Sequence, residues 1–294
     1  MTEETASAAL EDKRMALEAR LRSAGRLMVA YSGGADSAYL AYAAHLVLGA
    51  EMLAVIADSP SLSRAHLRDA VDFAQSHGIP LQVIETNELE HAEYVRNDGS
   101  RCFHCKDELF NVMGKAGIPL GFTTVAYGKN VDDMGEFRPG QKAAAQHNVI
   151  APLAEAELTK QEIRMLAQQA GLRIWDKPAS ACLSSRIAFG LPVTRETLES
   201  IEHAEEALFA MGFRQFRVRH HGELARIEIA REELDRMLSL SMFQQASEAL
   251  TRLGYKYVTL DMEGYRSGSM NALLPLAEIG TASGRMPSSR EAAK

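Results

Sequence analysis

The chain has 294 residues, of which 46% are hydrophobic and 24% are charged, and its formal net charge is -7. This length favours two domains, and the acidic balance argues against broad nucleic-acid binding, which needs a basic surface. The most apolar window, residues 38–57, is interrupted by His45, Gly49 and Glu51, so it predicts a helix, a turn and a strand instead of a membrane span. The polar N-terminus lacks the apolar core of a signal peptide, so we expect a cytoplasmic protein without a membrane partner.

After a helix at residues 8–22, the first half of the chain alternates short apolar runs with helical patterns. Ser63 is the expected N-cap of a helix that ends at Gly78, and Thr159 and Glu162 form a capping box for a helix that ends at Gly171. The predicted strands are 26–31, 52–57, 81–85, 122–127 and 149–152, and the remaining predicted helices are 36–48, 89–96, 103–115 and 141–146. Strands that alternate with helices indicate βαβ units and an α/β fold with a parallel sheet.

The pattern changes after Pro178. A helix at 191–212 is followed by strands at 214–220 and 223–230, two helical segments and a strand at 257–263. We therefore predict a first domain at 1–191 and a smaller α+β domain at 192–275. Residues 276–294 are mostly small and polar, and we expect them to be disordered.

The sequence SGGADS, residues 32–37, lies between the first predicted strand and the next helix. Such a loop combines backbone N–H groups with the positive end of the helix dipole, and glycines let an anion come close. The hydroxyls of Ser32 and Ser37 can donate hydrogen bonds to a phosphate. The carboxylate of Asp36 would repel a phosphate unless Mg²⁺ bridges them. A glycine-rich turn with Asp36 as an N-cap explains the same residues equally well.

This loop resembles the SGGxDS signature of the PP-loop ATP pyrophosphatases, which split ATP between its α and β phosphates. The resemblance implies a PP-loop domain with helices on both faces of the sheet, and pyrophosphate bound by Ser32, Gly33, Gly34, Asp36 and Ser37.

A second stretch, YGKNVDDMGEFRPG at residues 127–140, resembles a segment found in part of this superfamily. The resemblance implies that Gly128, Asn130, Asp132 and Asp133 line the nucleotide site, and that Asp58, at the end of the second strand, lies by the adenosine. On their own, the two aspartates of this stretch are more typical of a solvated turn.

The chain has three cysteines, and two of them, Cys102 and Cys105, have CxxC spacing. Such a pair can bind zinc, form a redox disulfide or ligate an iron–sulfur cluster, or it can be two half-buried thiols near a helix start. Cys182 lies in KPASACLSSR between Lys177 and Arg186. Positive charge lowers the pKa of a thiol and favours the nucleophilic thiolate.

Four segments together, SGGADS, RCFHCK, KPASACLSSR and LDMEGYRSGSMN, resemble the LarE-type ATP-dependent sulfurtransferases over residues 10–275. The resemblance implies an enzyme of nickel-pincer cofactor (lactate racemase) biosynthesis. Its substrate would be pyridinium-3,5-biscarboxylic acid mononucleotide. ATP adenylates one carboxylate of this substrate, and sulfur then displaces AMP to leave a thiocarboxylate.

The family supplies sulfur in two ways. In one, the cysteine that matches Cys182 gives up its own sulfur; in the other, three cysteines hold a [4Fe-4S] cluster. All three cysteines of this chain fall on the matching positions, so the resemblance favours a cluster bound by Cys102, Cys105 and Cys182.

Arg217 and Arg219 alternate along a predicted strand and therefore point to one face. With Arg186, they are assigned by the resemblance to the phosphate of the substrate nucleotide, although a solvated strand face explains the spacing of Arg217 and Arg219 as well. GYRSGS, around residues 266–269, is either a second anion-binding turn or simply a tight turn.

Three other functions compete with sulfur transfer to a small molecule. A tRNA thiolation enzyme of the same superfamily also uses a CxxC and a further cysteine, but the acidic balance and the lack of a recognisable RNA-binding domain argue against it. An amide-forming PP-loop ligase would give the cysteines no role. A non-catalytic nucleotide-binding or metal-storage module is the last alternative. The resemblance is compatible with a homo-oligomer.

Overall fold

The computed structural model describes residues 3–134, 139–178 and 181–266. It divides the chain into two units, of which the first comprises residues 1–86 and 103–180 and the second residues 87–102 and 181–294. The second unit is therefore built from two stretches that are far apart in the sequence. The predicted domain boundary between residues 191 and 192 stays a prediction.

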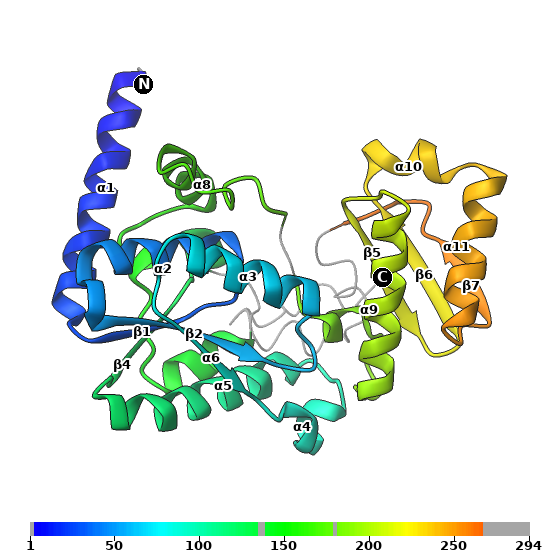
Figure 1. Ribbon diagram of the computed structural model, residues 1–294, viewed down its shortest axis with the longest axis horizontal. Helices are drawn as coiled ribbons and strands as arrows, with labels where there is room; N and C mark the ends of the chain where they lie inside the picture. Colours follow the sequence, from blue (N-terminus) through cyan, green and yellow to red (C-terminus); the bar gives the residue numbers. More distant parts are fainter. Residues whose placement is uncertain (1–2, 135–138, 179–180, 267–294) are drawn as a thin grey trace, which may run out of the picture. The chain divides into compact units, whose positions relative to one another are not determined.

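The first unit is an α/β unit around a four-stranded parallel sheet in the order β3-β2-β1-β4 (Figure 1). Its strands are β1 (Leu27–Ala30), β2 (Met52–Asp58), β3 (Leu81–Glu85) and β4 (Thr124–Tyr127). Its helices are α1 (Glu3–Ala24), α2 (Ala35–Leu48), α3 (Arg64–Ser76), α5 (Arg101–Gly117), α6 (Pro139–Gln146), α7 (Pro152–Glu155) and α8 (Lys160–Gln169), and 3-10 turns lie at Gly49–Glu51, Ile118–Leu120 and Val131–Asp133. Helix α5 begins with the last two residues of the second unit.

Helices cover both faces of this sheet (Figure 1). Leu27 and Val29 of β1 are buried in a core shared with α1, α2, α3 and α8. Met28 and Ala30, which alternate with them, are buried in a second core with α5 and α6. Because both faces are covered, β1 is apolar at every position, as is typical of a central parallel strand. The predicted PP-loop type of α/β architecture is confirmed.

The second unit contains a three-stranded sheet in the order β5-β6-β7, in which β5 and β6 are antiparallel and β6 and β7 are parallel. Its elements are α4 (Ala92–Val95), α9 (Arg195–Ala210), β5 (Phe216–His221), β6 (Leu224–Ile229), α10 (Arg231–Met237), α11 (Leu240–Arg252) and β7 (Tyr257–Leu260), with 3-10 turns at Glu88–Glu90 and Leu183–Arg186. Helices α9 and α11 bury Leu208 and Leu250 against Val218 and Ile227 of the sheet.

Two sequence-based predictions differ from the structure. The predicted fifth strand at 149–152 is wrong: Ile150 forms one isolated bridge with Ala126, and Pro152 begins α7, where its missing N–H costs nothing. The predicted helix at 89–96 is reduced to a 3-10 turn and the four-residue α4. The predicted disordered segment 276–294 lies outside the described residues, as does the second half of the GYRSGS turn, residues 267–269. Among the residues that are described, no helix is both long and apolar enough to span a membrane.

Candidate active site

The loop between β1 and α2 brings backbone N–H groups together, as its sequence predicts. Gly33 has φ +72°, a left-handed conformation that favours glycine, and a Cβ atom there would lie 2.6 Å from the Cβ of Ala70. Gly34 is the N-cap of α2, and no side chain caps the helix. The first N–H groups of a helix have no acceptor within it, so the start of α2 can bind an anion.

Hydroxyl groups flank these N–H groups. The Oγ atoms of Ser32 and Ser37 are 3.0 Å apart, and Ser37 Oγ also accepts a hydrogen bond from the Ser32 N–H over 3.1 Å. Both hydroxyls therefore lie at the start of α2, where the sequence predicted phosphate contacts.

Asp36 lies in the first turn of α2 with its carboxylate largely buried. One oxygen, Oδ2, accepts a hydrogen bond from the Asn130 amide over 3.2 Å. The other, Oδ1, is buried and has no hydrogen-bond partner among the described residues. Burial raises the pKa of Asp36, and the charge of Asp133 adds to the rise, whereas Lys160 and Arg164 oppose it. A buried carboxylate oxygen without a partner fits a Mg²⁺ ligand next to a phosphate.

The segment after β4 supports this arrangement. A Cβ atom on Gly128 would lie 2.7 Å from the backbone nitrogen of Ser37, so only glycine lets the chain pass so close to α2. Asn130 is fully buried and forms a capping box with Asp133 that holds the amide which contacts Asp36. The structure thus brings Gly128, Asn130 and Asp133 next to the loop, as the sequence predicted. Asp132 accepts a hydrogen bond from the Lys160 N–H at the start of α8.

Asp58 is the last residue of β2, the strand next to β1. In a parallel sheet the carboxyl ends of neighbouring strands share one edge, so Asp58 lies at the edge from which the loop begins. Its carboxylate forms an ion pair with Arg64. Arg64 also donates hydrogen bonds to the carbonyl oxygens of Ser59 and Leu62, over 2.9 and 2.7 Å. The proposed contact of Asp58 with adenosine stays a prediction.

In the second unit, Arg101 links Cys102 and Cys182. This buried guanidinium interacts electrostatically with both sulfur atoms, and it donates hydrogen bonds to Asn97 Oδ1 and to the Ser184 carbonyl. Two cysteines that are far apart in the sequence therefore share one positive neighbour.

The environment of Cys182 favours its thiolate. Burial by itself raises the pKa of Cys182, but Arg101, the Ser184 hydroxyl and Arg186 outweigh burial and hold the pKa below its usual value. The Sγ atom lies 3.1 Å from Ser184 Oγ. Cys182 is half-buried, as a thiolate nucleophile that meets a small substrate would be.

Arg186 fixes the turn that carries Cys182. It donates to the carbonyl oxygens of Ala181 and Cys182, over 2.6 and 2.9 Å, and forms a bidentate ion pair with Glu205 of α9. Both members of this pair are largely buried. The role of Arg186 that follows from these contacts is to hold the turn, and its predicted role in binding the substrate phosphate is not tested by them.

The arginines of β5 also have protein partners. Arg219 is buried and forms an ion pair with Glu228 at 2.7 Å, and its Nη1 donates to the Ser185 carbonyl. Arg217 donates to the Phe216 carbonyl and lies over the Tyr265 ring. Burial lowers the pKa of Arg217, and the neighbouring Arg186 lowers it further. Phosphate binding by Arg217 and Arg219 stays a prediction.

Cys102 and Cys105 are one helical turn apart at the start of α5, and Cys102 is exposed. Within residues 3–134, 139–178 and 181–266, no three His, Cys, Asp or Glu side chains are gathered closely enough to hold a metal ion. The soft thiolate chemistry of the cysteines fits an iron–sulfur cluster. Three-cysteine ligation of such a cluster stays a prediction.

Sequence reasoning missed two residues of these sites and one contact of a third. Arg101 was not considered because its partner Ser184 is distant in the sequence. His66 of α3 contacts the Ser32 carbonyl of the loop. Lys177, which precedes Cys182 in the sequence, donates a hydrogen bond to the Gly33 carbonyl over 3.2 Å. Among the positive side chains that lower the pKa of Cys182, Arg101 has the largest effect.

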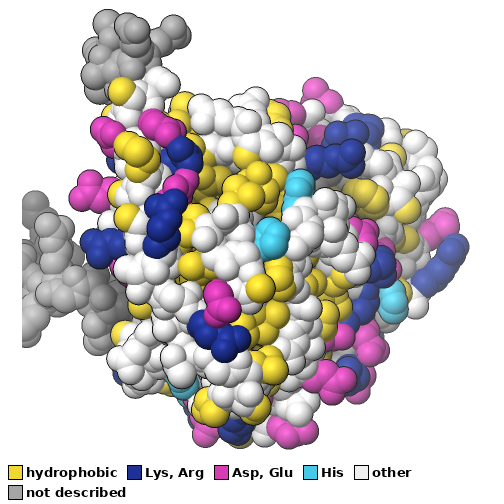
Figure 2. All heavy atoms as spheres, turned by 60° about the vertical axis from the view of Figure 1, so that its left-hand side comes forward, with side chains coloured by type: hydrophobic (Ala, Val, Ile, Leu, Met, Phe, Trp, Pro, Cys, Tyr) yellow, Lys and Arg dark blue, Asp and Glu magenta, His cyan; other side chains and the backbone are white. Residues whose placement is uncertain are grey.

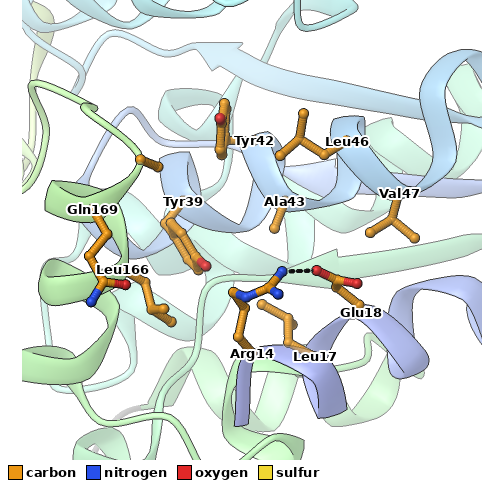
Figure 3. A pocket seen from close by; sticks show the side chains of 11 residues that line it. Arg14, Leu17, Glu18, Tyr39, Tyr42, Ala43, Leu46, Val47, Leu166 and Gln169 are labelled. Carbon is orange, nitrogen blue, oxygen red and sulfur yellow. Dashed lines mark hydrogen bonds and ion pairs between the residues drawn. The ribbon is translucent and has the colours of Figure 1, made fainter. Parts of the chain in front are cut away.

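A separate pocket of about 270 Å³ lies between α1, α2 and α8 (Figure 3). Its wall is mostly apolar, and an ion pair joins Arg14 to Glu18 at its rim. Figure 2 shows hydrophobic side chains beside charged ones of both signs on this side of the protein. None of the predicted site residues lines this pocket, so it is not the candidate active site.

The chain is similar to three proteins over most of its length, although no family model matches it. It is 39% identical over 265 residues to the uncharacterized protein slr1717 of Synechocystis sp., covering 90% of this chain and 99% of the relative. It is 29% identical to the uncharacterized protein MJ0830 of Methanocaldococcus jannaschii, covering 82% and 91%.

The third relative has an assigned function. The chain is 32% identical over 275 residues to the pyridinium-3,5-bisthiocarboxylic acid mononucleotide synthase of Lactiplantibacillus plantarum, covering 93% of this chain and 99% of the relative. An identity of this size over nearly the whole of both chains, together with the loop at the start of α2 and the setting of Cys182, identifies the chain as a member of the LarE family of pyridinium-3,5-bisthiocarboxylic acid mononucleotide synthases.

Proposed function

We propose that this protein is an ATP-dependent sulfurtransferase that forms AMP and pyrophosphate and converts a carboxylate of pyridinium-3,5-biscarboxylic acid mononucleotide into a thiocarboxylate. The product would serve the synthesis of the nickel-pincer cofactor. The observation that carries the proposal is the similarity to the Lactiplantibacillus synthase over 93% of this chain and 99% of the relative. The phosphate-binding geometry at the start of α2 and the thiolate setting of Cys182 support it.

The first half of the reaction is the activation of a carboxylate. A substrate carboxylate oxygen attacks the α-phosphorus of ATP, and the bond from this phosphorus to the bridging oxygen of pyrophosphate breaks. The N–H groups at Gly33 and Gly34 and the hydroxyls of Ser32 and Ser37 suit the binding of the departing pyrophosphate. Asp36 Oδ1 would bind the Mg²⁺ ion that neutralises the charge of the pyrophosphate.

The second half is the attack of sulfur on the activated acyl carbon. When Cys182 supplies the sulfur, its thiolate displaces AMP and forms a thioester. Removal of the Cα proton of Cys182 then breaks its Cβ–Sγ bond, which leaves the thiocarboxylate on the substrate and dehydroalanine in the chain. The guanidinium of Arg101 favours the thiolate that begins this sequence.

A [4Fe-4S] cluster is the other source of sulfur. Cys102, Cys105 and Cys182 would hold it, and the bound cluster would supply the sulfide that is transferred. In that form Arg101 would stabilise the thiolate state of two of the three ligands, Cys102 and Cys182.

The test is a single-turnover assay with ATP, Mg²⁺ and the pyridinium dicarboxylate mononucleotide. We expect pyrophosphate release that depends on this substrate, and a thiocarboxylate product identified by mass spectrometry. The variant Cys182→Ala should keep the pyrophosphate release and lose the sulfur product. Pyrophosphate release without dependence on the mononucleotide, or a sulfur product from Cys182→Ala, would contradict the proposal.

Two measurements on the protein identify the source of sulfur: its iron and sulfide content after purification, and its intact mass after the reaction. Iron and acid-labile sulfide at about four each per chain, on protein purified without oxygen, would establish the cluster. No iron, together with an intact mass that falls by the mass of H₂S, would establish Cys182 as a donor that is used once.

A further inference from the structure

Two side chains hold the carbonyl groups of the loop between β1 and α2. The Nε2 atom of His66 lies 2.6 Å from the Ser32 carbonyl oxygen, and Lys177 Nζ lies 3.2 Å from the Gly33 carbonyl oxygen. A carbonyl only accepts hydrogen bonds, so Nε2 of His66 carries the proton in this contact. Both contacts lie within the first unit.

These contacts decide where the N–H groups of the loop point. In a trans peptide the C=O and N–H bonds point in opposite directions, and the described chain contains no cis peptide. With the Ser32 carbonyl turned to His66, the N–H of Gly33 points away from His66. With the Gly33 carbonyl turned to Lys177, the N–H of Gly34 points away from Lys177.

Glycine alone would not keep the loop in this state. Gly33 and Gly34 lack Cβ atoms, so their peptide planes can rotate more readily than those of other residues. A loop of this kind needs contacts that select one orientation before the anion arrives, because an orientation that is only partly populated weakens binding in proportion. His66 and Lys177 provide such contacts from two different elements.

Both side chains are themselves held in place. His66 is 9% exposed and lies one helical turn before Ala70, whose carbonyl accepts a hydrogen bond from the Tyr31 hydroxyl over 2.8 Å. The backbone at Lys177 is held by Arg164, which donates to the carbonyl oxygens of Trp175 and Lys177 over 2.8 and 2.6 Å. Both residues that contact the loop are therefore held in place by the surrounding structure.

We infer that His66 and Lys177 are positioning residues which preset the Gly33 and Gly34 N–H groups for the pyrophosphate part of ATP. The inference rests on the proposed function, because it assumes that the loop binds pyrophosphate. It adds a requirement: two residues outside the SGGADS signature set the affinity of the signature for its anion.

The first test measures the binding of inorganic pyrophosphate, with Mg²⁺, to the full chain by calorimetry. His66→Leu removes the N–H donor at similar volume, and we expect about tenfold weaker binding, the size of one hydrogen bond. His66→Gln keeps an N–H donor and should bind nearly as well as the unchanged protein. Lys177→Met removes the second contact, and it tests the inference even where His66→Leu folds poorly.

Two control variants make the same kind of change away from the loop carbonyls. His77→Leu lies at the other end of α3, where the imidazole contacts the rings of Tyr42 and Phe73. Asp69→Asn removes the charge of the Asp69 carboxylate, whose Oδ2 atom lies 3.9 Å from Lys177 Nζ. Both should bind pyrophosphate like the unchanged protein.

A second readout follows the peptide orientation itself. In protein labelled with ¹⁵N at glycine, the amide signals of Gly33 and Gly34 should move when pyrophosphate is added to the unchanged protein and to His66→Gln. They should move less in His66→Leu at equal saturation, because the peptide is no longer turned toward the anion.

The outcomes separate this inference from the proposed function. If the unchanged protein binds neither pyrophosphate nor ATP, the proposed function and the inference fall together. If the unchanged protein binds pyrophosphate and both His66→Leu and Lys177→Met bind it equally well, the inference alone is overturned.

Discussion

One ionisable side chain in each unit stands out, Asp36 in the first and the half-buried Cys182 in the second, and their surroundings shift the two pKa values in opposite directions. Burial raises the pKa of Asp36, and only one of its carboxylate oxygens has a hydrogen-bond partner among the described residues. The pKa of Cys182 is lowered in spite of burial, because Arg101 and Arg186 are close. The environment of Asp36 is thus that of a cation ligand, whereas the thiolate of Cys182 is stabilised by positively charged side chains of the protein itself.

The Asp36 carboxylate should cost stability when no cation is bound. The pKa of Asp36 is higher in the folded than in the unfolded chain. Its contribution to the free energy of unfolding is therefore most favourable below the unfolded pKa of 3.8, and this contribution is lost as the pH rises through the folded pKa. Asp36→Asn removes this cost. We expect the variant to be at least as stable as the unchanged protein at pH 8, and to lose Mg²⁺-dependent pyrophosphate release by about a hundredfold or more, as is typical when a main electrostatic group is removed.

Thermal unfolding at pH 5 and pH 8 without Mg²⁺ measures the first part, and the pyrophosphate assay the second. The advantage of Asn over Asp should be larger at pH 8. A variant that is less stable than the unchanged protein at pH 8 would show that Oδ1 has a stabilising partner.

Arg101 should control the reactivity of Cys182. Arg101→Gln removes the positive charge that most lowers the pKa of this thiol. We expect the pH profile of its alkylation by iodoacetamide, followed on the Cys182 peptide by mass spectrometry, to move to higher pH. Arg96→Gln is the matched control, since Arg96 is exposed and paired with Asp98. Equal profiles for Arg101→Gln and the unchanged protein would rule out this role of Arg101.

At the scale of elements, the start of α2 is placed by the close approach of the chain after β4. Gly128 lies so near α2 that a Cβ atom would be 2.7 Å from the nitrogen and 2.9 Å from the Cα of Ser37. Its φ angle is not in the left-handed region, so the need for glycine here is one of space. The nucleotide loop therefore depends on contacts between sequence segments about ninety residues apart.

Gly128→Ala should push the first turn of α2 away from β4. We expect a loss of about 1–3 kcal/mol in the free energy of unfolding, typical of overpacking, and weaker ATP binding. Gly114→Ala in α5 is the control, because a Cβ atom there meets nothing within 4 Å. It should raise helix stability slightly and leave ATP binding unchanged. Unfolding measured in urea and ATP titration test both, and equal behaviour of the two variants would contradict the steric argument.

Most elements of the first unit could be predicted because the residues that begin and end them are close together in the sequence. The N-cap Ser63 and the capping box of Thr159 and Glu162 are present as the sequence indicates. The apolar run at residues 149–152 was misleading: it packs against the sheet, but Pro152 starts a helix and leaves only one bridge at Ile150. A run of apolar residues reports burial, and only its partners decide between strand and loop.

At the scale of the whole molecule, the predictable part of the site is the part carried by one continuous motif. The SGGADS loop could be located from its residues. The contacts of His66, Lys177 and Arg101 could not, because each joins segments that only the tertiary structure brings together. The division of the chain into units has the same origin, since residues 87–102 pack with residues from 181 onward.

The overall charge of -7 gives a prediction that separates sulfur transfer to a small mononucleotide from sulfur transfer to tRNA. A protein that uses tRNA must offset the charge of many phosphates, and its binding falls steeply with salt. We expect no binding of fluorescent tRNA at physiological salt in an anisotropy titration, while ATP binds under the same conditions. Tight, strongly salt-dependent tRNA binding would favour the tRNA thiolation enzyme.

The buried Asn97 has a consequence for the order in which the protein is made. Its amide donates to the carbonyl oxygens of Ala188 and Leu191, and its own carbonyl accepts from the Gly190 N–H. All three partners are synthesised long after it. During translation the side chains of Asn97 and Arg101, which are buried in the folded protein, must therefore stay hydrated until the later segment leaves the ribosome. The second unit can complete its fold only after that segment has been made.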